Sequence, residues 1–206
     1  MKKIGLLVTA SLMIIFIVPF SLVDSIKTRT EWEINLREIG QLNIGETAFD
    51  VRAEGDIVCL SYYTGYHIIN VSDPTNPTEL FHHHSSASGG IHQLDNDGNL
   101  LYIANFSDGL RILNISDPTH PIEIGHFNDG GNLWGLSVKD DLAYLADGGD
   151  GLEVCNVSDP THPVEVGQYA NFGLAMQVNI FNNLAYVSDL GSPLKILDIT
   201  EPSNIT

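Results

Sequence analysis

One eight-residue motif recurs along this chain at a nearly constant interval. It reads NVSDPTNP from Asn70, NISDPTHP from Asn114 and NVSDPTHP from Asn156, and it returns in altered form as DITEPSN from Asp198. Counted from the Ser or Thr of each copy, the intervals are 44, 42 and 42 residues. A constant period of this length is typical of folds in which one supersecondary unit is copied and stacked. The recurrence therefore predicts four copies of one such unit.

Each period contains four short runs rich in Val, Ile, Leu and Tyr, separated by Gly, Asp, Asn and Pro. In the third copy these predicted strands cover residues 134–138, 142–147, 152–157 and 164–169. Third strands such as the one containing Ile112 and Leu113 are apolar on both faces, as expected for a sheet packed between two other sheets. Four-stranded units of 40–45 residues that are buried on both faces indicate an all-β fold, a β-propeller of four antiparallel blades.

The predicted propeller covers residues 34–206. Its four repeats span about 45–84, 85–128, 129–170 and 171–206, and residues 34–44 supply one more strand. That strand is inferred from the sequence EIGQL at residues 38–42, which matches the fourth strands EIGHF at 123–127 and EVGQY at 165–169. The last repeat ends without a fourth strand of its own. We therefore expect residues 34–44 to pair with residues 194–199 and to close the ring, because closure removes open sheet edges.

Several phrases of the repeat are similar to a known family. YLAD at 144–147, GLEV at 151–154, VSDP at 157–160 and PVEVG at 163–167 resemble the LVIVD-repeat family of extracellular β-propellers, and the resemblance extends over residues 34–204. The chain departs from the family pattern with Asn in place of Asp at positions 70, 114 and 156, and with Ile205 where a copy would carry its second turn Pro. The resemblance implies a location outside bacterial or archaeal cells and leaves the activity open.

The first 26 residues differ in composition from the rest. Lys2 and Lys3 precede an uncharged apolar run from Ile4 to Val23, which is followed by Asp24. A short basic region before an apolar run is typical of a secretory signal, and a run of about 20 residues is also long enough to cross a bilayer as a helix. We expect an N-terminal hydrophobic helix, either a signal peptide or a membrane anchor. Both alternatives predict a secreted or cell-surface protein that meets the membrane only through this segment.

The chain is strongly acidic. Its formal net charge is −17 at pH 7, from 26 Asp and Glu against 9 Lys and Arg. This charge repels phosphate backbones and excludes nucleic acid as a natural partner, whereas divalent cations and basic partners remain compatible with it. The two cysteines, Cys59 and Cys155, fall in different copies, so we expect two buried free thiols rather than a disulfide.

One repeat position at the end of the second strand is oxygen-rich. Asn105, Asp147 and Asp189 occupy it, and they predict a rim on the side of the loops that lead into each blade. Asp108, Asp150 and Trp134 lie close to the same rim in sequence and complete the candidate ligand-binding set. Two interpretations stay open: the side chains cap the following Gly-rich loops through Asx turns, or they hold Ca²⁺ or a basic ligand.

Other candidate sites are weaker. His82, His84 and His92 are the metal-ligand candidates, although no set of His, Asp and Glu has the spacing of a zinc enzyme. Asn105 and Asn204 are the glycosylation candidates, because the other Asn-x-Ser sequences belong to the repeat motif itself. The sequence contains no Gly-x-Ser-x-Gly elbow and no phosphate-binding loop, so it offers no catalytic residue.

These observations favour a non-enzymatic binding or scaffold module, exported or on the cell surface. We expect a monomer without a cofactor, apart from Ca²⁺ at the rim, and a partner that is a cell-surface protein or a glycan. Two alternatives remain. One is a metal-dependent hydrolase or lyase, which rests on fold analogy alone. The other is a fragment of a longer repeat protein.

Overall fold

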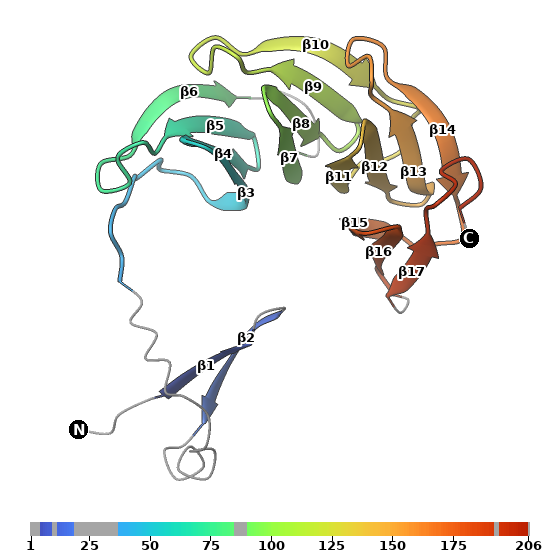
Figure 1. Cartoon of the computed structure of the whole chain (residues 1–206), viewed down its shortest axis with the longest axis horizontal. Coiled ribbons are helices and arrows are strands. Elements are labelled where there is room, and N and C mark those ends of the chain that lie inside the picture. The colour runs from blue at the N-terminus through green and yellow to red at the C-terminus, as the bar shows by residue number, and fades with distance from the viewer. Residues whose placement is uncertain (1–4, 10–11, 19–36, 85–89, 192–193, 206) are drawn as a thin grey trace. The chain divides into compact units, whose positions relative to one another are not determined.

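The structure is a computed structural model that describes residues 5–9, 12–18, 37–84, 90–191 and 194–205. It divides into two compact units, Met1–Glu38 and Ile39–Thr206. Figure 1 shows the strands of both units along the chain.

The N-terminal unit contains two strands, β1 (Gly5–Thr9) and β2 (Leu12–Val18), which pair antiparallel. These strands lie in the apolar run for which the sequence predicts a helix. The rest of that run lies outside the described residues, so the helix and its role as a signal or an anchor stay predictions. Among the residues that the structure describes, no helix is long and apolar enough to cross a membrane.

The second unit consists of four antiparallel sheets, which we call blades 1 to 4. Blade 1 contains β3 (Ala48–Glu54), β4 (Ile57–Tyr62), β5 (Gly65–Asn70) and β6 (Thr78–His84). Blade 2 contains β7 (Gln93–Asp97), β8 (Leu100–Ala104), β9 (Leu110–Asn114) and β10 (Ile122–Phe127). Blade 3 contains β11 (Gly135–Lys139), β12 (Leu142–Asp147), β13 (Gly151–Asn156) and β14 (Val164–Tyr169). Blade 4 contains β15 (Ala175–Phe181), β16 (Leu184–Asp189) and β17 (Lys195–Asp198). The predicted all-β propeller with four blades is therefore confirmed, and blade 4 has three strands.

The recurring motif forms the turn between the third and fourth strands. In blade 2, Asn114 Oδ1 accepts a hydrogen bond from the Ser116 amide at 2.8 Å, and Asp117 Oδ1 accepts bonds from the amide and hydroxyl of Thr119 at 3.0 and 2.6 Å. Blades 1 and 3 repeat the same bonds. The Thr119 bonds lower the pKa of Asp117. The motif thus recurs because each turn uses its Asn and Asp side chains to satisfy backbone amides.

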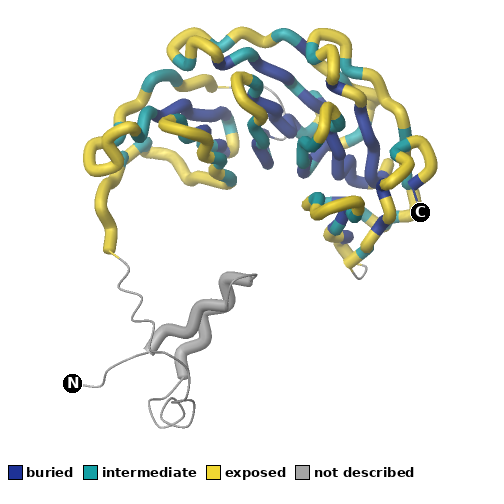
Figure 2. Tube along the Cα trace, in the orientation of Figure 1, coloured by how far each residue is buried: buried dark blue, intermediate teal, exposed yellow. Residues whose placement is uncertain are grey.

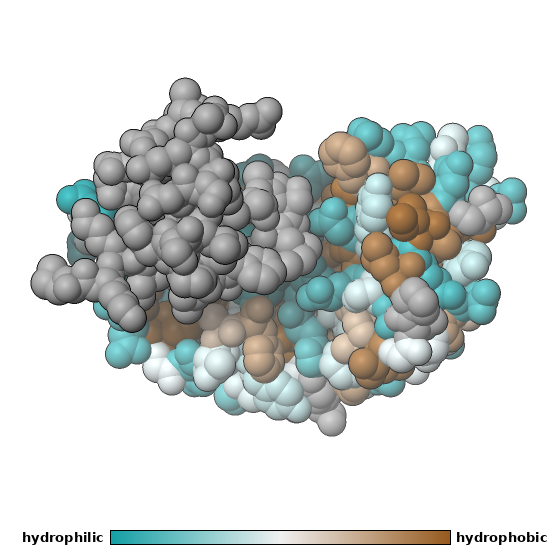
Figure 3. Space-filling model, turned by 90° about the horizontal axis from the view of Figure 1, so that it is seen from below, coloured by the Kyte–Doolittle hydropathy of each residue, from teal (hydrophilic) through white to brown (hydrophobic). Residues whose placement is uncertain are grey.

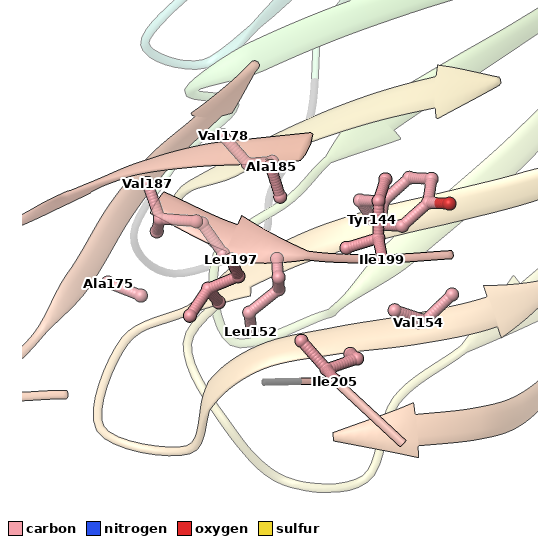
Figure 4. Packing of buried hydrophobic residues seen from close by; sticks show 11 residues of the cluster. Tyr144, Leu152, Val154, Ala175, Val178, Ala185, Val187, Leu197, Ile199 and Ile205 are labelled. Carbon is pink, nitrogen blue, oxygen red and sulfur yellow. The ribbon is translucent and has the colours of Figure 1, made fainter. Parts of the chain in front are cut away.

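The core lies between consecutive blades. Three clusters of buried apolar side chains join blade 1 to blade 2, blade 2 to blade 3 and blade 3 to blade 4. Figure 2 shows the buried residues concentrated in the strands of the blades, and Figure 4 shows the last cluster, where Leu152 and Val154 of β13 meet Val178, Val187 and Leu197 of blade 4. Both predicted free thiols are confirmed, and Cys59 and Cys155 are buried in these clusters.

A glycine brings the fourth strand of one blade against the turn of the next blade. The backbone of Gly125 in β10 lies so close to the Pro160 carbonyl of blade 3 that a Cβ atom would overlap it, and Gly167 in β14 meets Pro202 of blade 4 in the same way. Gly40 makes the equivalent approach to Pro74 of blade 1. The segment around Gly40 therefore occupies the position of a fourth strand that precedes blade 1.

The expected ring closure is not formed in this structure. β17 pairs only with β16 among the described residues, and residues 37–44 contain no strand; residues 34–36 lie outside the described part. The first strands of the blades touch in sequence, β3 with β7, β7 with β11 and β11 with β15, and no comparable contact joins β15 to β3 in the described chain. In the described chain, the segment that packs on blade 1 is therefore not paired with β17.

Replacing Gly125 by Ala tests the close approach between blades. The added Cβ would overlap the Pro160 carbonyl, so we expect Gly125→Ala to lower the free energy of unfolding by about 1–3 kcal/mol, the usual cost of overpacking. Gly149→Ala is the matched control, because a Cβ at Gly149 meets nothing within 4 Å. Urea denaturation measures both variants, and equal stabilities would contradict this account of the joint.

Candidate functional site

One position in the third strand differs in charge from blade to blade. It lies three residues before the Asn or Asp that ends the strand and is filled by His67 in blade 1, Arg111 in blade 2, Glu153 in blade 3 and Lys195 in blade 4. Three of these four side chains are bases. Glu153 is therefore a reversal of charge at a repeated position.

In blades 1 and 2 the base is paired with an acid of the neighbouring fourth strand. His67 Nδ1 lies 2.7 Å from Glu79 Oε2 in blade 1. In blade 2 the Arg111 guanidinium lies 2.5 Å from Glu123 and 2.9 Å from Asp108. Each of these acids therefore has a basic side chain beside it.

Blade 3 brings three carboxyl groups together instead. Asp129 comes from the connection between β10 and β11, Asp147 ends β12, and Glu153 lies in β13. One carboxylate oxygen of each lies within 4.8 Å of the others. Among the described residues, no other group of three His, Cys, Asp or Glu side chains converges in this way. We call these three residues the acidic triad. They converge because β12 and β13 are paired neighbours and the connection from blade 2 passes over their ends.

Two members of the acidic triad are buried and incompletely bonded. Glu153 is 0% exposed and Asp147 is 5% exposed. Glu153 Oε1 accepts a hydrogen bond from Gln168 Nε2 at 3.4 Å, while Glu153 Oε2 and Asp147 Oδ1 are buried without a hydrogen-bond partner. The Asp147 carboxylate lies directly against the backbone of Gly131, where any larger residue would collide with it. Buried polar atoms without partners are rare in native proteins, so these two oxygens call for a physical explanation.

The environment disfavours the ionised form of both buried acids. Burial, and then the charges of Asp129 and Asp150, raise the pKa of Asp147 to about 7. Burial, a hydrogen bond with Asp129 and the charge of Asp147 raise the pKa of Glu153 to about 9. Without a cation, Glu153 and part of the Asp147 population therefore hold a proton at neutral pH. A cation among the three carboxylates would stabilise the ionised form, which is the form that ligates metals.

The three equivalent rim residues have different surroundings. Asp189 Oδ1 accepts hydrogen bonds from the amides of Gly173 and Leu174 at 3.0 and 2.7 Å, so this carboxylate fixes the connection into blade 4. Asn105 Nδ2 donates to Asp108 Oδ2 at 3.4 Å, and the Asn105 Oδ1 atom is buried without a partner. Asp147 belongs to the acidic triad. All three side chains are buried, so the repeat position points into the blades rather than to solvent.

The remaining rim candidates lie near these residues and have distinct roles. Asp108 pairs with Arg111, and Asp150 is exposed in the loop that follows Asp147. Trp134 packs in an aromatic group, with its ring centroid 4.6 Å from that of His92 and 4.9 Å from that of Phe106. The structure thus places Trp134 among packed rings between blades 2 and 3.

The histidine candidates are not brought together. His82 and His84 lie in β6, the last strand of blade 1, and His82 Nδ1 is 3.3 Å from Glu79. His92 comes directly before β7, the first strand of blade 2; it stacks on Phe49 and makes a tilted ring contact with Trp134. They therefore form no common ligand group in the described chain.

The two glycosylation candidates differ in exposure. Asn204 is exposed, whereas Asn105 is 2% exposed. A glycan at Asn105 would require the end of β8 to open, so burial argues against modification of the folded chain there.

Glu153 and Asp129 were missed by reasoning from the sequence. A signal for Glu153 was present, because alignment of the four copies shows an acid where the others carry His, Arg or Lys. Asp129 has no comparable signal. Its role depends on the path of the connection between blades, which the repeat pattern does not specify.

We expect the stability of the cation-free chain to fall as pH rises from about 4.5 to 9. Glu153 has a raised pKa in the folded state, so the folded chain binds more protons than the unfolded chain in this window, and folding weakens as those protons leave. Glu153→Gln should flatten the decline and increase the free energy of unfolding at pH 8 by roughly 1–3 kcal/mol, since the amide carries no charge to desolvate. Asp140→Asn, at the exposed β11–β12 turn, is the control and should keep the parental slope. Urea denaturation with a chelator at several pH values measures the effect, and an unchanged slope in Glu153→Gln would contradict it.

Comparisons with known proteins agree with this architecture. The chain matches solved structures of two computationally designed proteins. It superposes on Ika4 with a TM-score of 0.64 at 8% identity, covering 81% of this chain and 99% of that one. It superposes on Ika8 with a TM-score of 0.60 at 9% identity, covering 75% of this chain and 46% of that one, so it spans less than half of the longer design. At these identities the likeness shows the fold alone, and no curated protein matches the chain.

The family model of the LVIVD repeat matches four times, at residues 45–84, 94–129, 130–171 and 172–206. Three of these matches begin within one residue of a predicted repeat, the second begins nine residues later than predicted, and together they cover most of the chain. The sequence motif, the blades and the family model all identify the same unit, and this chain belongs to the LVIVD repeat family.

Proposed function

We propose that this chain is a non-enzymatic binding or scaffold module of the cell exterior whose third blade holds a divalent cation. The observation that carries the proposal is the replacement of a base by Glu153 at one repeat position. Blades 1 and 2 place His67 and Arg111 there, each beside an acid. Blade 3 keeps the equivalent acid of the fourth strand, Glu165, and loses the base. A cation in the acidic triad would supply the missing positive charge.

The unpartnered oxygens support this proposal independently of the charge pattern. Glu153 Oε2 and Asp147 Oδ1 are both removed from water and lack a hydrogen-bond donor. Burying a carboxylate without a partner is costly, and metal coordination is one of the few ways in which proteins offset that cost. Both oxygens belong to residues whose carboxyl groups converge with that of Asp129.

Ca²⁺ has the chemistry that fits the acidic triad. All three side chains offer hard oxygen ligands, and Ca²⁺ takes six to eight such ligands in flexible geometry. Asp129 is exposed, so water can complete the coordination on its side. Mg²⁺ demands nearly ideal octahedral geometry and gives up its own water reluctantly, which suits a site with two buried carboxylates less well. We expect an affinity of about 10⁻⁴–10⁻³ M, as in extracellular calcium modules.

A cation at this position would link the connection between blades to the sheet of blade 3. Asp129 belongs to the connection, whereas Asp147 and Glu153 belong to β12 and β13. The bound ion would therefore fix the rim of blade 3, where the chain could contact a cell-surface protein or a glycan. The acidic charge of the chain favours a partner with a basic surface. The location outside the cell is supported by the basic residues and apolar run at the N-terminus.

Calcium titration of the purified full-length chain tests the cation site. With 10 mM CaCl₂, we expect the melting temperature to rise by about 3–10 °C, as mass action predicts for this affinity and chain size. Glu153→Gln should abolish the rise, because it removes a buried ligand of the acidic triad. Asp140→Asn removes the same charge from an exposed turn and should keep the full response.

A second variant separates loss of the site from loss of the fold. Glu153→Arg places a guanidinium where blade 2 has Arg111, beside the equivalent acids Asp150 and Glu165. We expect this variant to melt above the cation-free parent and to be insensitive to calcium, because its own cation fills the site. A parent that does not respond to Ca²⁺, or a Glu153→Gln variant that still responds, would refute the cation site.

A further inference from the structure

The last blade presents an apolar face that has no partner in the described chain. Leu194, just before β17, and Ile196 within it are 60% and 55% exposed. Their equivalents in blade 3, Leu152 and Val154, are both 0% exposed because they pack against blade 4. Figure 3 shows hydrophobic side chains gathered on the side of the molecule where blade 4 lies. The outer face of blade 4 is thus built like a face that another blade covers.

The first blade presents the complementary face. Val51 in β3 is 53% exposed. The equivalent residues of the other first strands, Leu94, Leu136 and Val178, are 0%, 0% and 3% exposed, because each packs against the preceding blade. Phe49, also in β3, is 51% exposed. Blade 1 therefore has the packing surface of a blade that follows another blade.

The segment at residues 39–42 shows which strand is missing between these two faces. Gly40 lies against Pro74 of blade 1 as Gly125 lies against Pro160 of blade 3. In the joint between Gly125 and Pro160, the glycine belongs to the fourth strand of the preceding blade, blade 2. The segment around Gly40 is consequently in place as a fourth strand without its own blade, and β17 is the third strand of a blade without a fourth strand.

The curvature of the chain decides where the two faces meet. Among the described residues, the first strands of blades 1 and 4 share no contact comparable to the one that joins every consecutive pair of first strands. The segment around Gly40 therefore cannot rest on blade 1 and pair with β17 of the same chain.

We propose that two copies of this chain join head to tail, so that blade 4 of each copy packs on blade 1 of the other. In each joint, residues 39–42 of one copy become the fourth strand of blade 4 in the other copy. The two joints are identical by symmetry, so the assembly closes as a dimer in which the free edge of β17 is paired. A dimer replaces the monomer that the sequence led us to expect.

The existing joints fix the register of the proposed pairing. In blade 3, Glu153 pairs with Gln168 and Val154 pairs with Gly167. The same repeat positions are Lys195 and Ile196 in β17, and Gln41 and Gly40 in the N-terminal segment. We therefore expect Lys195 of one copy to lie opposite Gln41 of the other.

A cysteine crosslinking experiment on the full-length chain tests this register. Gln41→Cys and Lys195→Cys are prepared as separate single variants, mixed, unfolded, refolded together and oxidised. We expect a disulfide-linked dimer that contains one chain of each variant. The native Cys59 and Cys155 are buried and should stay unreactive. The control mixture is Gln168→Cys with Lys195→Cys, because Gln168 has the same repeat position but is already in its own blade; this mixture should not crosslink.

Two further measurements decide between the outcomes. Light scattering should give twice the chain mass for the parent. Ile196→Glu places a charge on the proposed interface and should give a folded monomer. The control Val164→Glu places the same charge on β14, away from that interface, and should remain dimeric. A parent that is monomeric at micromolar concentration overturns the proposal. A double variant with Gln41→Cys and Lys195→Cys that forms its disulfide within one chain also overturns it, because that result would mean that the ring closes on itself.

Discussion

The burial of each blade against its neighbours is the interaction on which the rest of the structure depends. Leu94, Leu136 and Val178 lie at one repeat position of the first strand, and each is buried by the blade before it. Leu152 and Val154 are buried in turn by the blade that follows. A sheet with two apolar faces is not stable alone in water, because neither face can be left solvated without losing its hydrophobic stabilisation. The stability of each blade therefore depends on the neighbouring blades that bury its two faces.

This dependence explains which residues recur and which do not. The Asn and Asp side chains of the SDP turns bond backbone amides in blades 1, 2 and 3, and the glycines of the fourth strands allow the blades to approach. Such residues repeat because every joint needs them. The residue three places before the end of the third strand is not part of the turn or of the glycine contact. Its identity changes from His67 to Arg111, Glu153 and Lys195.

The acidic triad illustrates the physical cost of such a change. Arg111 in blade 2 is paired with two acids, so its charge is compensated where it is partly buried. Glu153 has acids as neighbours, and burial together with those neighbours raises its pKa to about 9. Removing one partner of a buried pair leaves an uncompensated group, which a protein resolves by holding a proton or by binding a cation. Among the described residues, the buried carboxylate oxygens without a hydrogen-bond partner lie in blade 3, on Asp147 and Glu153.

The sequence by itself determined the repeat unit, the number of blades and the strands within them. The expected strands at 142–147 and 164–169 coincide with β12 and β14, and the two cysteines are free as expected, because period, turn chemistry and strand composition are local properties. Only the tertiary structure decided how blade 1 and blade 4 relate and which acids meet. Closure depends on the small angles between successive blades, which add up along the stack and leave no local pattern. Asp129 reaches Glu153 because a connection crosses the end of two strands, a contact that no spacing along the chain encodes.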